Sequence, residues 1–314
     1  MKIRVLMMIA FVSAVMLNSA CYRTASATEG GTCPYLPGTR DIFMGGMSAP
    51  GLHVREDAIW VVSRFYDMAP RQAFHADGRA RAYINMIRLS YFFDKKVLGA
   101  RWGCGMLLPY AHGNISVRIT ANGRTIKRMR DSNTGFGDLS IMPVILGWSA
   151  GRLLWNAALT LYPPTGEYNR HRIVNIGRNR FAAAPALGVT WYDPKRKQEA
   201  SFAFNYVFNF ENHATNYRSG DQIVVDWGLR QHTAWGFTAG ISGYVVAQTT
   251  PDRGSGAKSG SFRGTSFAAG PLATYSFKLA GRTVDFIVKY YDEFHVKNRW
   301  EGDVLWLSFR TRLF

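Results

Sequence analysis

Cysteines, acidic residues and long apolar runs are all scarce in this sequence. Only three cysteines occur among 314 residues, and 38 lysines and arginines outnumber 21 aspartates and glutamates. A hydrophobic content of 47% excludes a bundle of membrane-spanning helices. It does not exclude a membrane β-barrel, whose polar inner face dilutes the average. The net charge of +17 predicts anionic surroundings or partners, such as lipid phosphates or acidic solutes.

Motifs of metal, nucleotide and acyl-transfer chemistry are also missing. The sequence contains no CxxC pair, no HxH or HExxH spacing, no GxSxG and no P-loop. We therefore expect no metal, no cofactor and no enzymatic activity. Spacing alone leaves one alternative open, in which Ser242 or Ser308 acts with a histidine.

The N-terminus predicts export. Lys2 and Arg4 precede an apolar run at 5–17, and Ala25-Ser26-Ala27 has the small-x-small pattern of a cleavage site. Residues 1–27 are therefore interpreted as a signal peptide, since the apolar run is too short to span a bilayer. A competing interpretation is a lipoprotein acylated at Cys21. The other two cysteines, Cys33 and Cys104, either form a disulfide in an oxidising compartment or stay free.

Two regions come after the signal peptide. Residues 28–50 are rich in glycine and proline and show no period, which predicts an irregular N-terminal tail or a plug. Residues 51–314 alternate between apolar and polar positions, as β-strands do. The expected strands are 52–66, 80–94, 97–111, 135–146, 152–162, 181–192, 199–210, 221–230, 236–249, 262–278, 282–294 and 303–314.

The stretch 199–212 shows the alternation most clearly. Phe202, Phe204, Tyr206, Phe208 and Phe210 fall on one face, and small or polar residues fall on the other. An aromatic face of this kind is either the core of a soluble sandwich or the lipid-facing wall of a barrel.

The connections between strands decide between these alternatives. They alternate between tight turns and long polar segments, at 68–79, 112–134, 163–180, 211–220, 251–261 and, shorter, 295–302. Outer-membrane barrels have this layout. We therefore predict an all-β protein, a transmembrane antiparallel β-barrel of about 12 strands with short periplasmic turns and long extracellular loops, in the bacterial outer membrane.

Charged side chains on the expected strands must face inward, because a lysine or arginine facing lipid at mid-membrane costs about 2–4 kcal/mol. They either fill a narrow barrel with ion pairs or line a polar path for a solute. The predicted lumen-lining residues are Asn205, Asn209, Asp226, Arg230, Asp285, Lys289, Glu293, Arg310 and Arg312. Of these, we expect Asn205 and Asn209 to contact a solute more than any aromatic residue of their strand.

The segment 163–180 is predicted to form a basic extracellular loop with Arg170, Arg172, Arg178 and Arg180. It either binds lipopolysaccharide phosphates or attracts anionic solutes such as aromatic carboxylates. Nucleic acid is not an expected partner of an exported chain with a lipid-facing wall.

Several motifs resemble one protein family. Gly135–Trp148 (GFGDLSIMPVILGW), Leu161–Asn169 (LYPPTGEYN) and Asn175–Pro194 (NIGRNRFAAAPALGVTWYDP) are similar to the phenol meta-degradation pathway (MetA/SphA-like) family. The resemblance covers nearly the whole mature chain. It implies an outer-membrane transporter for the passive uptake of small hydrophobic or aromatic compounds. The alternative is a structural or surface barrel whose loops bind lipopolysaccharide or a partner without transport. The closing strand departs from the usual pattern, because Arg310 and Arg312 stand four and two positions before Phe314.

Overall fold

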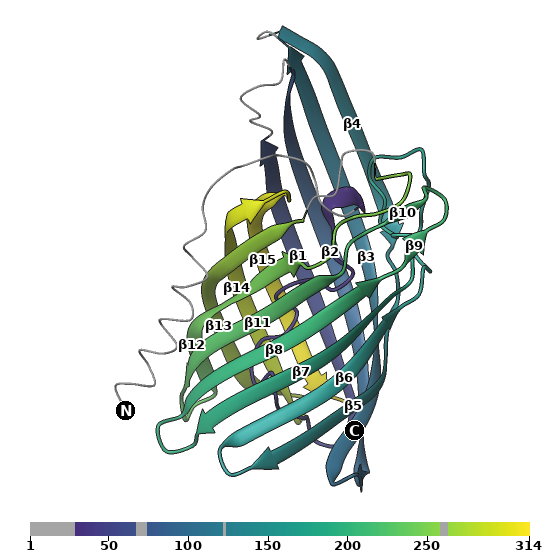
Figure 1. Cartoon of the computed structure of the whole chain (residues 1–314). Helices are drawn as coiled ribbons and strands as arrows, with labels where there is room; N and C mark the ends of the chain where they lie inside the picture. Colours follow the sequence, from purple (N-terminus) through teal and green to yellow (C-terminus); the bar gives the residue numbers. More distant parts are fainter. Residues whose placement is uncertain (1–28, 67–73, 122–123, 258–262) are drawn as a thin grey trace, which may run out of the picture.

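The computed structural model describes residues 29–66, 74–121, 124–257 and 263–314 of the chain. The predicted signal peptide and Cys21 lie outside the described residues. A short 3-10 helix, η1 (Glu29–Gly31), comes first, and β-strands make up most of the chain after it (Figure 1). In the part of the chain that is described, no helix is long and apolar enough to cross a membrane.

Twelve long strands form a closed antiparallel barrel. Each pairs with its neighbour in the order β1-β2-β3-β5-β6-β7-β8-β11-β12-β13-β14-β15, and β15 pairs with β1 to close the ring. Closure satisfies the backbone groups of every strand internally, as a wall in lipid requires. Their bounds are β1 (Gly51–Tyr66), β2 (Phe74–Val97), β3 (Ala100–Ala121), β5 (Ser140–Ala150), β6 (Leu153–Tyr162), β7 (Ala182–Asp193), β8 (Gln198–Asn209), β11 (Gln222–His232), β12 (Phe237–Gln248), β13 (Thr265–Leu279), β14 (Arg282–Lys297) and β15 (Glu301–Arg312). The predicted fold class and strand number are confirmed.

Three of the connections expected to be polar loops contain strands instead. Strand β3 continues to Ala121. Its residues 110–121 pair with β4 (Arg124–Phe136), and its residues 101–107 pair with β5. Strand β2 begins at Phe74 and pairs with the same extension. Together β2, β3 and β4 form a sheet that projects beyond one rim of the barrel (Figure 1). The prediction failed because this sheet has weakly apolar faces, so its alternation resembled a solvated loop. In the connection 211–220, the pairs Glu211–Asn212 (β9) and Tyr217–Arg218 (β10) form a small hairpin.

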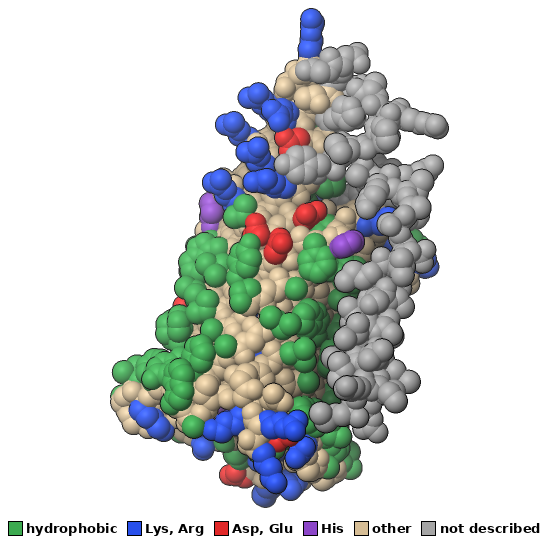
Figure 2. Space-filling model, turned by 90° about the vertical axis from the view of Figure 1, so that its left-hand side faces the viewer, with side chains coloured by type: hydrophobic (Ala, Val, Ile, Leu, Met, Phe, Trp, Pro, Cys, Tyr) green, Lys and Arg blue, Asp and Glu red, His purple; other side chains and the backbone are tan. Residues whose placement is uncertain are grey.

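The two faces of the wall differ in polarity, as β8 shows. Phe202, Phe204 and Phe208 are exposed on the outside, whereas Asn205 and Asn209 are buried inside. Figure 2 shows the resulting belt of hydrophobic side chains around the barrel, with lysines and arginines above and below it. A broad apolar exterior with charge confined to its two ends is the surface of a protein that sits in a bilayer.

The connections are short at one end of the barrel and long at the other. Tight turns join β5 to β6 and β13 to β14, with Gly151 (φ +57°) and Gly281 (φ +77°) in the left-handed conformation. The segment 163–181, between β6 and β7, lies at the opposite end, where the sheet of β2, β3 and β4 also projects (Figure 1). Both ends of the barrel wall, Gly51 and Phe314, are at the short-turn end. There the amide of Leu52 donates to the Phe314 carbonyl at 3.1 Å.

Candidate functional site in the barrel lumen

The residues from Glu29 to the start of β1 run through the inside of the barrel (Figure 1). Cys33, Tyr35, Asp41 and Met44 of this segment are buried. We call residues 29–50 the lumen segment. Its polar groups bind inward-facing side chains of strands far away in the sequence, so the segment and the wall determine the lumen together.

Asp226 of β11 holds the first part of the lumen segment. The hydroxyl of Tyr35 donates to Asp226 Oδ2, and the amide of Gly38 donates to Oδ1 at 2.9 Å. Gly38 has φ +82°, and a Cβ at this position would lie 2.7 Å from the Tyr291 ring. The position therefore requires glycine both for its backbone conformation and for its close contact. The Gly38 carbonyl accepts a hydrogen bond from Lys289 Nζ at 2.6 Å.

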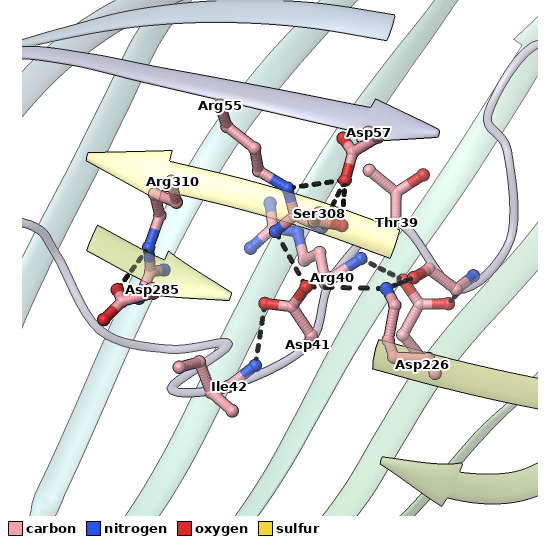
Figure 3. Close-up of polar contacts among 12 residues, drawn as sticks. Thr39, Arg40, Asp41, Ile42, Arg55, Asp57, Asp226, Asp285, Ser308 and Arg310 are labelled. Atoms are coloured by element: carbon pink, nitrogen blue, oxygen red, sulfur yellow. Dashed lines mark hydrogen bonds and ion pairs between the residues drawn. The ribbon is translucent and has the colours of Figure 1, made fainter. Parts of the chain in front are cut away.

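Asp41 is at the centre of a buried ionic network (Figure 3). Its carboxylate lies 2.7 Å from Arg55 Nη1 and 3.4 Å from Lys289 Nζ. Arg55 also pairs with Asp57 at 2.7 Å, and Ser308 donates to the same Asp57 oxygen at 2.5 Å. Burial alone would raise the pKa of Asp41, but Arg55 and Lys289 outweigh it and hold the pKa well below its ordinary value. Asp41 is therefore a carboxylate at neutral pH.

Glu199 of β8 forms a second polar anchor. Its Oε1 accepts the amide of Phe43 at 2.8 Å and pairs with Arg230 at 2.6 Å, and its Oε2 contacts His232 at 2.8 Å. Two strands away in the same wall, on β6, Asn156 Nδ2 donates to the Met44 carbonyl at 2.8 Å. Two nearby strands, β6 and β8, thus bind the adjacent residues Phe43 and Met44 of the lumen segment.

The four arginines of the predicted basic loop divide into two pairs. Arg170 and Arg172 are exposed, as expected for a loop. Arg180 is buried, 3.6 Å from Glu29, and Arg178 donates to the Cys33 carbonyl at 2.8 Å. The prediction of a single solvated basic loop was therefore wrong for the second pair. Their guanidinium groups turn inward because the lumen segment supplies their partners.

The predicted lumen-lining residues occupy different parts of the barrel. Asp226 and Lys289 meet at Gly38, and Arg230 binds Glu199. Asp285 pairs with Arg310 at 2.7 Å, and Glu293 accepts from Tyr244 at 3.0 Å. Asn209 is buried and lies 3.4 Å from Arg180, while Asn205 is buried and lines a cavity beside the lumen segment. Arg312 and Phe314 are exposed at the short-turn end.

Several residues of the network did not stand out in the sequence. Arg55 and Asp57 are two residues apart in β1, which was the available signal that they share one face of the strand. Tyr35 and Asp41 lie in a stretch without any period, so no pattern assigned them a partner. The role of Tyr35, for example, depends on its contact with Asp226, 191 positions away in the sequence.

A cavity of about 290 Å³ lies between the lumen segment and the wall formed by β2, β3, β5 and β6. Four methionines line it, together with several aliphatic and aromatic side chains. Its polar lining is dominated by guanidinium groups. The apolar lining includes Met44, Met47, Met86, Met142, Phe92, Leu107, Ile145, Ile176 and Tyr162, and the cationic lining comprises Arg40, Arg55, Arg88, Arg178 and Arg310.

The remaining candidate chemistry has structural explanations. Cys33 and Cys104 are free thiols, so the disulfide alternative is not present. Ser308 binds Asp57, and Ser242 contacts the hydroxyl of Tyr291. Among the described residues, no group of three or more histidine, cysteine or acidic side chains could hold a metal ion.

The fold and lumen define a β-barrel of the outer-membrane type, and comparison with known proteins agrees. The chain belongs to the family described as "Putative MetA-pathway of phenol degradation", whose sequence model matches residues 63–309. The resemblance found in the motifs is thereby confirmed. The chain matches no functionally curated protein.

Three of the solved structures that match the chain illustrate the comparison. The COG4313 outer membrane channel from Pseudomonas putida F1 matches with a TM-score of 0.68 and 13% identity, over 87% of this chain and 99% of that chain. The transport unit of the autotransporter AIDA-I from Escherichia coli has a TM-score of 0.46 and 12% identity, covering 88% and 93%. A Pseudomonas aeruginosa FadL homologue has a TM-score of 0.42 and 12% identity, covering 84% and 90%. At these identities the first match supports the fold.

Proposed function

We propose that this protein is a passive channel of the bacterial outer membrane for small hydrophobic or aromatic compounds. The cavity of about 290 Å³ inside the barrel carries the proposal. Ligand sites are typically concave and combine apolar side chains with polar groups that orient the ligand, and this cavity has both kinds of lining. A closed structural barrel would have no need for a methionine-lined cavity, whereas flexible methionine side chains suit solutes of varied shape.

In this proposal, residues 1–27 are a signal peptide, the lumen segment is a plug, and 51–314 form the channel wall. The contacts at Asp226, Asp41 and Glu199 hold the plug on one side of the lumen. The predicted lumen-lining residues then serve mainly to bind the plug, and the solute path runs through the cavity. Catalysis is not part of the proposed function, since Ser242 and Ser308 are hydrogen-bonded within the wall.

Uptake across an asymmetric membrane tests the proposal. The protein is reconstituted in vesicles whose outer leaflet is lipopolysaccharide, which slows the unassisted entry of phenol. We expect faster entry of phenol than in protein-free vesicles, and no faster entry of sucrose. Equal phenol entry with and without the protein would overturn the channel proposal and favour the alternative of a structural surface barrel.

A further inference from the structure

Three arginines stand side by side on the inner face of the barrel. Arg310 of β15 is directly opposite Arg55 of β1, and Arg55 is directly opposite Arg88 of β2. Like charges at such positions repel unless anions separate them. The three side chains line the same cavity. An arginine among them without a carboxylate partner is therefore free to bind an anionic group of a ligand.

Two of these arginines have carboxylate partners and the third does not. Arg310 pairs with Asp285 at 2.7 Å, and Arg55 pairs with Asp41 and Asp57, each at 2.7 Å. Arg88 has no ion pair with any residue that the structure describes, and its Nε is buried without a hydrogen-bond partner there. The next residue along the row is Leu107, which offers no acceptor.

The balance of charge around the cavity is also positive. Five arginines line it against two carboxylates, Asp41 and Asp138. Asp41 is taken by Arg55 and Lys289, while Asp138 accepts the amides of Gly166 and Arg178. No carboxylate of the described lining is left for Arg88. Arg88 is half-buried, and a partly desolvated guanidinium without an ion-pair partner gains from a ligand carboxylate.

Beside Arg55 and Ser90, the cavity lining near Arg88 is largely apolar. Met86, Leu107 and Phe92 line the cavity on β2 and β3, and Met142 lines it from β5. A volume of about 290 Å³ exceeds the roughly 150 Å³ of an apolar cavity that binds benzene. One aromatic ring with a carboxyl group therefore fits both the size and the two kinds of lining.

We propose that the cavity is a binding site for aromatic carboxylates, in which Arg88 binds the carboxylate and the methionines contact the ring. The proposal deepens the channel function by naming an anionic solute class, and it rests on that function only for its role in uptake. Arg88 is then a specificity-determining residue, because it separates carboxylates from neutral aromatic compounds of the same size.

Calorimetric titration of the full purified barrel with benzoate and with phenol at pH 7 tests this site. In Arg88→Met we expect the benzoate dissociation constant to rise at least about tenfold, since hydrogen bonds to charged groups are among the strongest. Phenol, which is neutral at this pH, should bind both proteins alike. Arg88→Lys keeps the charge and should recover part of the benzoate affinity.

Arg81→Met is the matched control, because Arg81 is exposed on the same strand outside the barrel. It should bind benzoate as the unaltered protein does. Equal benzoate affinity in Arg88→Met, with the barrel folded, would overturn the proposed site. Because binding is measured without transport, this failure differs from the failure of phenol uptake, which concerns the channel itself.

A second inference concerns the outer face of the projecting sheet. The register places Arg64, Arg79 and Arg130 in one row and Arg118 with Arg128 in the next. All five are exposed, and Arg118 is also paired with Asp77 at 2.7 Å. We call these five residues the arginine face. Figure 2 shows lysine and arginine side chains gathered where the sheet rises above the hydrophobic belt.

The arginine face continues the lipid-facing side of the wall. Trp60, Tyr83, Tyr110 and Phe136 are exposed on the same outer side of these strands, at the rim of the belt. Arg64 is four residues beyond Trp60, and Arg128 is eight residues beyond Phe136. Counted from the row of Trp60 and Tyr83, the arginines lie four to six residues farther along the strands, which is roughly 13 to 20 Å at about 3.3 Å per residue.

We infer that the arginine face binds the phosphate groups of lipopolysaccharide. This site replaces the loop 163–180 as the main lipopolysaccharide contact, because two arginines of that loop turn inward. Opposed arginines such as Arg118 and Arg128 are unfavourable by themselves and favourable around a shared phosphate.

Binding of purified lipopolysaccharide to the barrel, before and after enzymatic dephosphorylation, tests this inference. The variant Arg79→Gln/Arg118→Gln/Arg130→Gln should bind at least about tenfold more weakly. The control Lys95→Gln/Lys195→Gln/Arg196→Gln removes equal charge from the exposed short-turn end and should bind normally. Unchanged binding in the first variant, or equal binding of dephosphorylated lipopolysaccharide, would contradict the inference.

Discussion

The two sides of the lumen are lined in different ways. On the side of β8, β11, β14 and β1, the lumen segment is bound through carboxylates, a lysine and an arginine at distances of 2.6 to 3.4 Å. On the side of β2, β3, β5 and β6, methionines and aliphatic residues leave a cavity. Directional ionic contacts hold the segment in one place, whereas the adaptable apolar side leaves space beside it. This difference is the basis of our proposal that one side holds the segment as a plug and the other passes a solute.

Removal of the lumen segment should have the largest effect on this arrangement. In a variant without residues 29–50, the space that the segment occupies becomes part of the pore. We expect single-channel conductance in planar bilayers to increase several-fold, since a plugged lumen passes few ions. A conductance equal to that of the full chain would show that the segment does not limit the pore.

Loss of the central carboxylate should have the next largest effect. Asp41→Asn leaves Arg55 and Lys289 buried with less compensation, and we expect a loss of about 3–5 kcal/mol in the free energy of unfolding. Asp285→Asn is the matched control. Its pair with Arg310 is partly exposed, so we expect a loss of about 1 kcal/mol or less. Urea denaturation followed by tryptophan fluorescence measures both, and equal losses would contradict the central role of Asp41.

The contribution of Asp41 to the free energy of unfolding should depend on pH. The pKa of Asp41 is held below its ordinary value of 3.8, so its contribution is complete above that value and declines as the pH falls below it. We expect the stability difference between the unaltered protein and Asp41→Asn to stay constant from neutral pH to about pH 5 and to shrink below about pH 4. A difference that shrinks already near neutral pH would contradict this assignment.

A change on the cavity side should have the smallest effect. Met142→Leu conserves the volume and polarity of a side chain that lines the cavity, and we expect it to change the free energy of unfolding by less than about 1.5 kcal/mol. Urea denaturation of Met142→Leu beside Asp41→Asn checks this. If Met142→Leu proved as costly as the loss of the central carboxylate, the cavity lining would be a tightly packed core rather than an adaptable surface.

The sequence predicted the wall of the barrel well, and the reason is local. In β8, Phe204 and Asn205 alternate between lipid and lumen because successive side chains of a strand point to opposite faces. The same rule placed Asp226 and Lys289 inside. It was less reliable in β4, where exposed polar residues occupy both faces and the period of two is obscured.

By itself, the sequence determined the barrel class, the twelve strands and the two faces of most of them, since each follows from patterns within a dozen residues. Only the tertiary structure decided which buried charges have partners. Tyr35 and Asp226 are 191 positions apart, and Asp41 meets Lys289 across 248. That Arg55 is neutralised and Arg88 is not depends on how an aperiodic segment crosses the closed barrel. No local pattern encodes that path, because long-range hydrogen bonds and ion pairs that form only on folding determine it.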